Sequence, residues 1–226
     1  MTLPCSQSDG ALRRHDLVFV SPAAWRAMLE SHPDLAQEPL VAGWADRGWP
    51  LIVRRVMPGE AKGLPLGLPL PPSHGKRRLA FVTQPGDVIA TAPPPLLRTA
   101  MDAASPAWRP TMERLVDLAA AYDGEARVFG SLAWRLLTGL DYLTTRSDLD
   151  ILLPLPPAGD VTRLTGELAA LEIAAPMRLD GELVRSDGAA VNWRELHDGS
   201  QEVLVKTIRD AALASARQFL GAEASS

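Results

Sequence analysis

The chain has 226 residues, a length that suits one large domain or two small ones. Apolar residues make up 46% of it and charged residues 22%, which is ordinary for a globular protein, and the net charge of −4 argues against nucleic-acid binding through a dominant basic surface. Cys5 is the single cysteine, so no internal disulfide can form and we expect a reducing, cytoplasmic compartment. No apolar run reaches the roughly 20 residues of a membrane span, and we expect neither membrane insertion nor a secretory signal.

The first part of the chain predicts a small domain of mixed helix and strand. A Ser-Pro pair predicts a helix over residues 22–30, because serine caps helices and proline suits the first turn. Short apolar runs predict strands at residues 50–57 and 78–82. Between these strands, residues 58–72 hold prolines and glycines that exclude a regular helix.

A proline-rich segment separates the two parts of the chain. Three consecutive prolines at residues 93–95 are typical of a linker or a rigid entry to the next domain. We therefore place a boundary within residues 92–105, which divides the chain into a first domain at 1–98 and a second at 99–226.

The second part predicts an α+β domain, in which helices pack on a small mixed sheet. Apolar residues at helical spacing mark the first element, and short apolar runs mark the strands. The predicted elements are a helix at 111–122, a strand at 127–129, a helix at 132–137, a strand at 148–153, a helix at 161–171, strands at 177–184 and 190–196, and a helix at 203–220, with a strand at 203–205 as the alternative for its start.

Two short motifs in this second domain carry chemistry. A Gly-Ser turn, Gly130 and Ser131, leaves an apolar strand and begins a helix, which is a place where backbone can approach an anion closely. Asp148 and Asp150 are two positions apart on the next predicted strand, so both carboxylates project from the same face. Such a pair repels unless a cation lies between the two groups, and Mg²⁺ prefers oxygen ligands. Together the motifs predict metal-assisted transfer of a nucleotidyl group.

Each motif alone has a simpler explanation. A single Asp-x-Asp also occurs at a solvated strand edge, and a Gly-Ser turn also serves only as a helix cap. Their order, on a strand, turn, helix and strand, resembles the DNA polymerase beta-like nucleotidyltransferase superfamily, although the gap is lengthened by residues 138–146. In that superfamily a third acid follows, and the candidates here are Asp180, which we favour, and Glu195.

Further segments, spread over residues 12–220, resemble a narrower family. The segments are RRHDLV at 13–18, PLIVRR at 50–55, GLPLPP at 67–72, GKRR at 75–78, FGSLAW at 129–134, TGL at 138–140, SDLD at 147–150, NWREL at 192–196 and VLVKT at 203–207. Together they resemble the malonate decarboxylase holo-acyl-carrier-protein synthases, also called phosphoribosyl-dephospho-CoA transferases.

This resemblance implies an unusual reaction. The phosphoribosyl-dephospho-CoA group would pass from triphosphoribosyl-dephospho-CoA to a serine of the apo acyl-carrier subunit of malonate decarboxylase, and pyrophosphate would leave. Asp148 and Asp150 would be the essential acids and hold Mg²⁺ or Mn²⁺, with Asp180 as the third acid. The first domain would bind substrate or carrier and the second would be catalytic. The alternatives are a nucleotidyltransferase that uses ATP or CTP on a small acceptor, an inactive nucleotide-binding subunit, and a citrate-lyase carrier synthase.

A donor rich in phosphate needs cationic side chains, and an acidic carrier would favour a local basic face. Arg54 and Arg55 alternate faces of one strand, so only one of them can face a ligand. The competing interpretation is that such charges only solubilise a strand edge or extend to solvent. The candidate phosphate-binding residues are Lys76, Arg77, Arg78 and Lys206.

Overall fold

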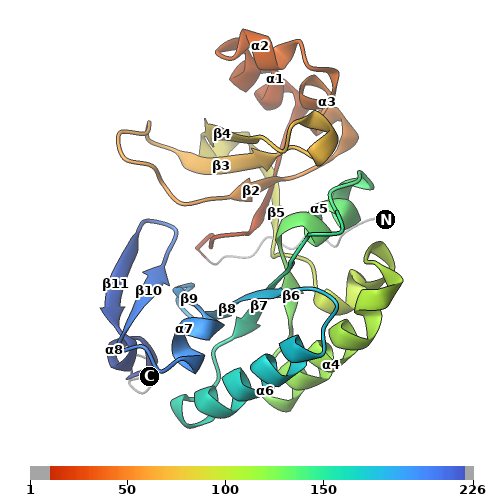
Figure 1. Cartoon of the computed structure of the whole chain (residues 1–226). Helices are drawn as coiled ribbons and strands as arrows, with labels where there is room; N and C mark the ends of the chain where they lie inside the picture. Colours follow the sequence, from red (N-terminus) through yellow and green to blue (C-terminus); the bar gives the residue numbers. More distant parts are fainter. Residues whose placement is uncertain (1–10, 222–226) are drawn as a thin grey trace. The chain divides into compact units, whose positions relative to one another are not determined.

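The computed structural model describes residues 11–221, which form two compact units that meet in sequence at Pro94 and Pro95 (Figure 1). Each unit combines one sheet with several helices, so the predicted α+β class is confirmed. Cys5 lies outside the described residues. Within residues 11–221, no helix has the length and apolar character needed to cross a membrane.

The N-terminal unit holds a five-stranded antiparallel sheet in the order β4-β3-β2-β1-β5. Its strands are β1 (Leu17–Val20), β2 (Leu51–Val53), β3 (Leu64–Pro69), β4 (Arg78–Thr83) and β5 (Val88–Ala92). Its helices are α1 (Pro22–Glu30), α2 (Pro33–Ala36) and α3 (Pro39–Ala42), with 3₁₀ turns at Ala45–Arg47, Pro72–His74 and Pro85–Asp87.

Helix α1 is confirmed at its predicted bounds, and its cap explains its start. The Ser21 hydroxyl accepts a hydrogen bond from the Ala24 amide at 3.1 Å, and Pro22 follows as the first helical residue. The helix buries Trp25, whose indole N–H donates to the Val41 carbonyl at 2.8 Å and whose ring meets Phe81 edge-on at 4.9 Å. These contacts fasten the helix to the sheet.

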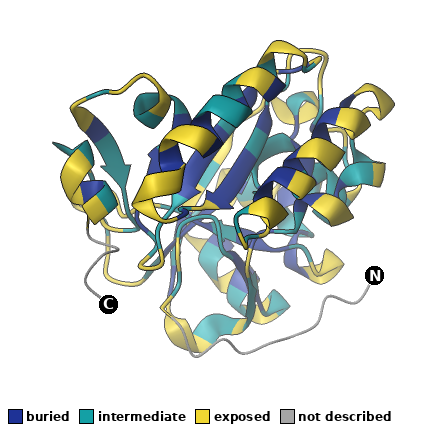
Figure 2. Ribbon diagram, turned by 90° about the horizontal axis from the view of Figure 1, so that it is seen from below, coloured by how far each residue is buried: buried dark blue, intermediate teal, exposed yellow. Residues whose placement is uncertain are grey.

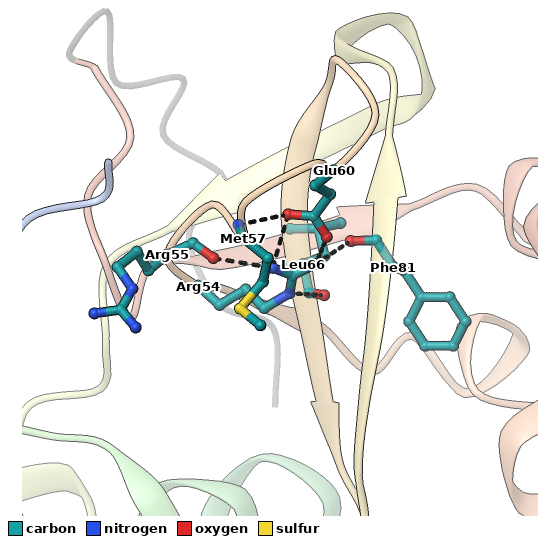
Figure 3. Close-up of polar contacts among 6 residues, drawn as sticks. All are labelled: Arg54, Arg55, Met57, Glu60, Leu66 and Phe81. Atoms are coloured by element: carbon teal, nitrogen blue, oxygen red, sulfur yellow. Dashed lines mark hydrogen bonds and ion pairs between the residues drawn. The ribbon is translucent and has the colours of Figure 1, made fainter. Parts of the chain in front are cut away.

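A partly buried ion pair between Arg54 and Glu60 holds the connection from β2 to β3 against the sheet (Figure 3). The Arg54 guanidinium donates to both carboxylate oxygens of Glu60. It also donates to the carbonyls of Leu66, at 3.0 Å, and Phe81, at 3.3 Å, which lie on the neighbouring strands β3 and β4. Arg54 therefore joins β2, β3 and β4. Of the two neighbouring arginines, Arg55 is the exposed one, and its side chain points away from Glu60 in Figure 3.

Glu60 makes the stability of this unit depend on pH. The Arg54 guanidinium holds the pKa of the Glu60 carboxyl below its ordinary value. A carboxyl whose pKa is lowered by folding adds stability above its unfolded pKa and loses it as the pH falls through the folded value. At pH 7 we expect Glu60→Gln to lower the free energy of unfolding by about 1.5–3 kcal/mol.

Thermal unfolding across a pH series checks this expectation. The difference between wild type and Glu60→Gln should shrink as the pH falls below about 4, where carboxyls become protonated. Glu30→Gln, which changes an exposed carboxyl in the same unit, is the matched control and should behave like wild type. A Glu60→Gln difference that stays constant from pH 7 to the acid range would contradict the ion-pair explanation.

The C-terminal unit holds a six-stranded sheet in the order β11-β10-β9-β8-β7-β6. Strands β7 and β8 are parallel, and the other neighbours are antiparallel. The strands are β6 (Arg127–Val128), β7 (Leu149–Pro154), β8 (Leu179–Val184), β9 (Ala190–Asn192), β10 (Glu202–Lys206) and β11 (Ala211–Ser215). The helices are α4 (Arg109–Ala121), α5 (Gly130–Thr138), α6 (Val161–Ile173), α7 (Trp193–His197) and α8 (Ala216–Gly221), with 3₁₀ turns at Leu97–Thr99, Met101–Ala103, Pro106–Trp108 and Ala158–Asp160.

The long helices α4 and α6 turn their buried residues toward the sheet and their exposed residues outward (Figure 2). Alternate residues of β7 and β8 fill the core beneath them: Leu149, Ile151, Leu153, Leu179 and Leu183. Because side chains alternate along a strand, the polar residues between them lie on the opposite face of the sheet. That opposite face carries the candidate site.

The predicted strand at 190–196 is wrong in its second half. Strand β9 ends at Asn192, and the chain continues as helix α7. The Asn192 side chain caps this helix by accepting a hydrogen bond from the Arg194 amide at 3.0 Å. The apolar residues that suggested a longer strand, Trp193 above all, instead pack under the sheet from the helix.

The predicted helix at 203–220 is also wrong over most of its length, and the alternative of a strand at its start is confirmed. Strands β10 and β11 form an antiparallel hairpin, and only α8 is helical. The Thr207 amide donates to the Asp210 carbonyl at 2.8 Å and closes the turn. The alanines of β11 favour a helix locally, but pairing with the valine-rich β10 overrides that preference.

Candidate functional site

Three elements of the C-terminal unit meet at the candidate site. Gly130 begins α5 directly after β6, Asp150 lies in β7, and Asp180 lies in β8. The Phe129 amide donates to the Asp150 carbonyl at 3.1 Å, which ties the start of α5 to β7. Asp150 stands directly opposite Asp180 in the parallel pairing of β7 and β8. The two carboxylates therefore leave the same face of the sheet side by side.

Only glycine fits at position 130, because the backbone there lies against the Asp150 carboxylate. Its φ of +61° is in the left-handed region, which favours glycine. A Cβ at this position would lie 1.8 Å from Asp150 Oδ2 and 2.5 Å from its Cγ. The sequence interpretation used this glycine for an approach to phosphate, and the structure shows an approach to the carboxylate. Ser131 follows in the first turn of α5, partly buried, and its phosphate-binding role stays a prediction.

Asp148 stands just before β7, two residues ahead of Asp150. Its carboxylate lies 3.9 Å from the guanidinium of Arg178, an exposed ion pair that adds little stability. Arg178 was assigned no role from the sequence. Because Leu149 pairs with Leu179, the residues before them, Asp148 and Arg178, are brought together. The contact could have been predicted only from the correct register between β7 and β8.

The donor set suits a hard divalent cation. Asp148, Asp150 and Asp180 offer only carboxylate oxygens, and Mg²⁺ commonly takes one or two carboxylates and completes its shell with waters and substrate phosphates. Among residues 11–221, no three acidic, histidine or cysteine side chains lie together in a way that could hold a metal ion, so a cation here would also need phosphate oxygens from the substrate. Because Gly130 has no Cβ, the Asp150 carboxylate has room to lie against the start of α5. The residues therefore fit Mg²⁺ or Mn²⁺ bound together with a phosphorylated substrate.

The geometry favours Asp180 over Glu195 as the third acid. Asp180 lies beside Asp150, whereas the Glu195 carboxylate accepts a hydrogen bond from the Leu204 amide at 2.6 Å. Glu195 thereby holds strand β10 to helix α7, which is a structural task. The assignment of Asp180 as a catalytic acid stays a prediction.

The basic segment before β4 belongs to the N-terminal unit, whereas the acids belong to the C-terminal unit. It forms an exposed turn, in which Lys76 has a φ of +52° and Arg78 begins the strand. Arg77 forms an ion pair with Glu38, which raises the pKa of Arg77 and lowers that of the carboxyl. Nothing in these contacts assigns a ligand to the three residues, and their phosphate-binding role stays a prediction.

Lys206 lies on β10 and faces a buried carboxylate. Its ammonium is 2.9 Å from Glu182 Oε1, and the Glu182 side chain is only 6% exposed. This contact joins β10 to β8 across the narrow strand β9. A buried carboxylate is costly without a partner, so Lys206 has a structural role that the sequence did not indicate.

Removing the ammonium should therefore destabilise the fold. We expect Lys206→Met to lower the free energy of unfolding by about 3 kcal/mol, because the buried Glu182 carboxylate loses its contact with the Lys206 ammonium. The double variant Lys206→Met with Glu182→Gln should recover most of that loss, since no charge stays buried. Thermal unfolding of the three proteins measures both effects. Unchanged stability in Lys206→Met, accompanied by a higher KM for the donor, would show that Lys206 serves the substrate instead.

Comparisons with known proteins cover nearly the whole chain. The family model of the phosphoribosyl-dephospho-CoA transferase MdcG N-terminal domain matches residues 13–94, and that of the MdcG C-terminal domain matches residues 96–217. The phosphoribosyl-dephospho-CoA transferase of Bradyrhizobium diazoefficiens is 52% identical over 220 residues, which is 97% of both chains. The protein of the same name from Xanthomonas euvesicatoria is 37% identical over 202 residues, 88% of this chain and 92% of the relative. No solved structure matches significantly.

Proposed function

The chain belongs to the phosphoribosyl-dephospho-CoA transferase family of enzymes, and from this premise we propose that it loads the apo acyl-carrier subunit of malonate decarboxylase. The donor is triphosphoribosyl-dephospho-CoA, the acceptor is a serine hydroxyl of the carrier, and the leaving group is pyrophosphate. The observation that carries the proposal is the facing pair Asp150 and Asp180 beside Gly130, within a chain whose residues 13–94 and 96–217 match the two domains of this family. An acidic centre of this kind suits displacement at a triphosphate.

The proposed reaction exchanges a phosphoanhydride bond of the donor for a phosphoester bond to the carrier. The serine Oγ of the carrier forms a bond to the α-phosphorus of the donor, and the bond from that phosphorus to the bridging oxygen breaks. Pyrophosphate leaves with the bonding electron pair, and the proton of the serine hydroxyl passes to a carboxylate oxygen of Asp180 or to water. The nucleophile comes from the carrier, so this chain has to orient two partners and hold charge rather than supply an attacking group.

Asp148 and Asp150 would hold the cation, and Gly130 keeps Asp150 in place. When bound, Mg²⁺ or Mn²⁺ supplies a charge that stabilises the phosphate oxygens and the departing pyrophosphate. Two roles are open to Asp180: its carboxylate completes the cation site, or one of its oxygens takes the proton of the serine hydroxyl. Arg178, exposed beside Asp148, is placed to neutralise phosphate oxygens through its guanidinium.

The N-terminal unit carries a basic turn of its own. Lys76, Arg77 and Arg78 are exposed together in the turn before β4. Their positive charge would contact donor phosphates or the acidic surface typical of acyl carriers. Such contacts are screened by salt, so carrier binding that uses them weakens as ionic strength rises.

A mass measurement tests the proposed function. Purified apo carrier is incubated with the enzyme, Mg²⁺ and the triphosphoribosyl donor, and the carrier is weighed by intact-mass spectrometry while pyrophosphate is assayed in the same sample. We expect a gain equal to one phosphoribosyl-dephospho-CoA group on the carrier serine, with one pyrophosphate released for each carrier. If the malonate decarboxylase carrier stayed unmodified and a citrate lyase carrier was modified, the acceptor would be the citrate lyase carrier. Incorporation of a labelled nucleotide from ATP or CTP into a small acceptor, with no carrier modified, would overturn the proposal.

A further inference from the structure

Asn192 makes two side-chain hydrogen bonds that join the candidate site to a neighbouring helix. It is the last residue of β9 and the cap of α7. Its Oδ1 accepts from the Arg194 amide at 3.0 Å, and its Nδ2 donates to Asp180 Oδ1 at 3.0 Å. We infer that Asn192 is a positioning residue, which orients the Asp180 carboxylate toward the shared cation, and this inference rests on the proposed function.

The cap bond settles which way the amide of Asn192 faces. A backbone N–H can only donate, so the atom that meets Arg194 must be the carbonyl oxygen of the side chain. The NH₂ group is then the atom that meets Asp180. Because the NH₂ group is a donor, it fixes the carboxylate of Asp180 through Oδ1, and Oδ2 is the oxygen that can face a cation. A neutral amide gives this orientation without adding a positive charge that would compete with the cation.

The segment that carries Asn192 is firmly anchored. The next residue, Trp193, is 2% exposed, and its indole N–H donates to the Leu179 carbonyl at 3.2 Å. A Cβ at Gly181 would lie 2.8 Å from the Trp193 ring, so this glycine admits the indole against β8. Trp193 therefore packs against both neighbours of Asp180, which are Leu179 and Gly181. This packing fixes the side-chain NH₂ group of Asn192 relative to the Asp180 carboxylate.

The two hydrogen bonds can be separated by substitution. Serine caps helices about as well as asparagine, so Asn192→Ser keeps an acceptor for the cap but loses the amide donor to Asp180. Outer hydrogen bonds to metal ligands commonly change metal affinity by 10–100-fold. We expect Asn192→Ser to raise the dissociation constant for Mn²⁺ about tenfold, measured by electron paramagnetic resonance on the protein without donor or carrier. The thermal midpoint should stay within about 2 °C of wild type, which corresponds to the small difference between the two caps.

A double-mutant cycle with Asp180→Ala shows whether Asn192 acts through Asp180. In the Asp180→Ala background, Asn192→Ser should change Mn²⁺ affinity less than twofold, because the carboxylate that Asn192 orients is gone. Ser21→Ala is the matched control for loss of a helix cap, since Ser21 caps α1 in the other unit. It should lower the thermal midpoint and leave Mn²⁺ affinity unchanged. In the transfer assay, Asn192→Ser should lower kcat with little change in KM for the donor.

The outcomes separate this inference from the proposed function. Wild-type Mn²⁺ affinity in a folded Asn192→Ser protein would overturn the positioning role. So would an equal loss of affinity in both the wild-type and the Asp180→Ala backgrounds, since the effect would then bypass Asp180. If Asn192→Ser does not fold, Asn192→Thr, which also retains a hydroxyl cap, replaces it in the same cycle. Failure of the wild-type enzyme to modify any carrier would count against the proposed function alone.

Discussion

Asp150→Asn should slow carrier modification by about a thousandfold while the protein stays folded. The substitution keeps the volume of the side chain, which matters because Gly130 leaves no space for a larger group. It removes the negative charge that, with Asp148, would hold the cation against the donor triphosphate. The measurement is the initial rate of mass gain on the carrier, taken at saturating donor, beside the thermal midpoint of the variant.

Asp117→Asn is the matched control for this substitution. Asp117 lies on the exposed side of α4, so the same chemical change there should leave the rate unchanged. If Asp150→Asn retained a rate within twofold of wild type, the carboxylate would have no part in the reaction. Partial recovery of the variant by Mn²⁺ in place of Mg²⁺ would support a direct bond from residue 150 to the cation.

Gly130→Ala should damage both stability and activity. An alanine held at a φ of +61° costs about 1–2 kcal/mol, and its Cβ overlaps the Asp150 carboxylate. The side chain of Asp150 or the start of α5 then has to move. Because a displacement of about 1 Å in a reacting centre can cost about 100-fold, we expect transfer to fall by that factor or more.

Gly139→Ala separates the two effects of that substitution. Gly139 ends the same helix with a φ of +73°, and a Cβ there would meet nothing within 4 Å. It should lose a similar amount of stability and keep its activity. Urea unfolding and the carrier assay on both variants provide the comparison. Equal activity in the two alanine variants would contradict the requirement for close packing between Gly130 and Asp150.

The local part of the candidate site could be predicted from the sequence. The sequence predicted Asp148 and Asp150 on one strand, and the structure places Asp150 in β7 and Asp148 directly before it. Gly130 was singled out as a place of close approach, but what approaches it depends on how β6 and β7 pair. Asp180 was predicted because its strand follows the helix after the acidic pair, where the resembled superfamily has its third acid, and its role stays a prediction.

The contacts between distant strands could not be predicted in the same way. Asn192 and Asp180 meet because β9 turns back along β8, and Lys206 reaches Glu182 across β9, so both depend on strand order. Residues 203–220 favour a helix locally, but the pairing of β10 with β11 makes most of them strand. In the N-terminal unit, β3 contains Pro65 and Pro69, which hid a strand that the sheet nevertheless accommodates.

The most direct test of the acidic centre is anomalous diffraction from crystals grown with Mn²⁺ and the triphosphoribosyl donor in the absence of carrier. Without the serine nucleophile the donor stays intact, and the Mn²⁺ signal locates the cation independently of any assay. We predict an anomalous peak bonded to carboxylate oxygens of Asp148 and Asp150 and to phosphate oxygens of the donor. A donor bound elsewhere, with Mn²⁺ away from both aspartates in an enzyme that still modifies carrier, would contradict this site.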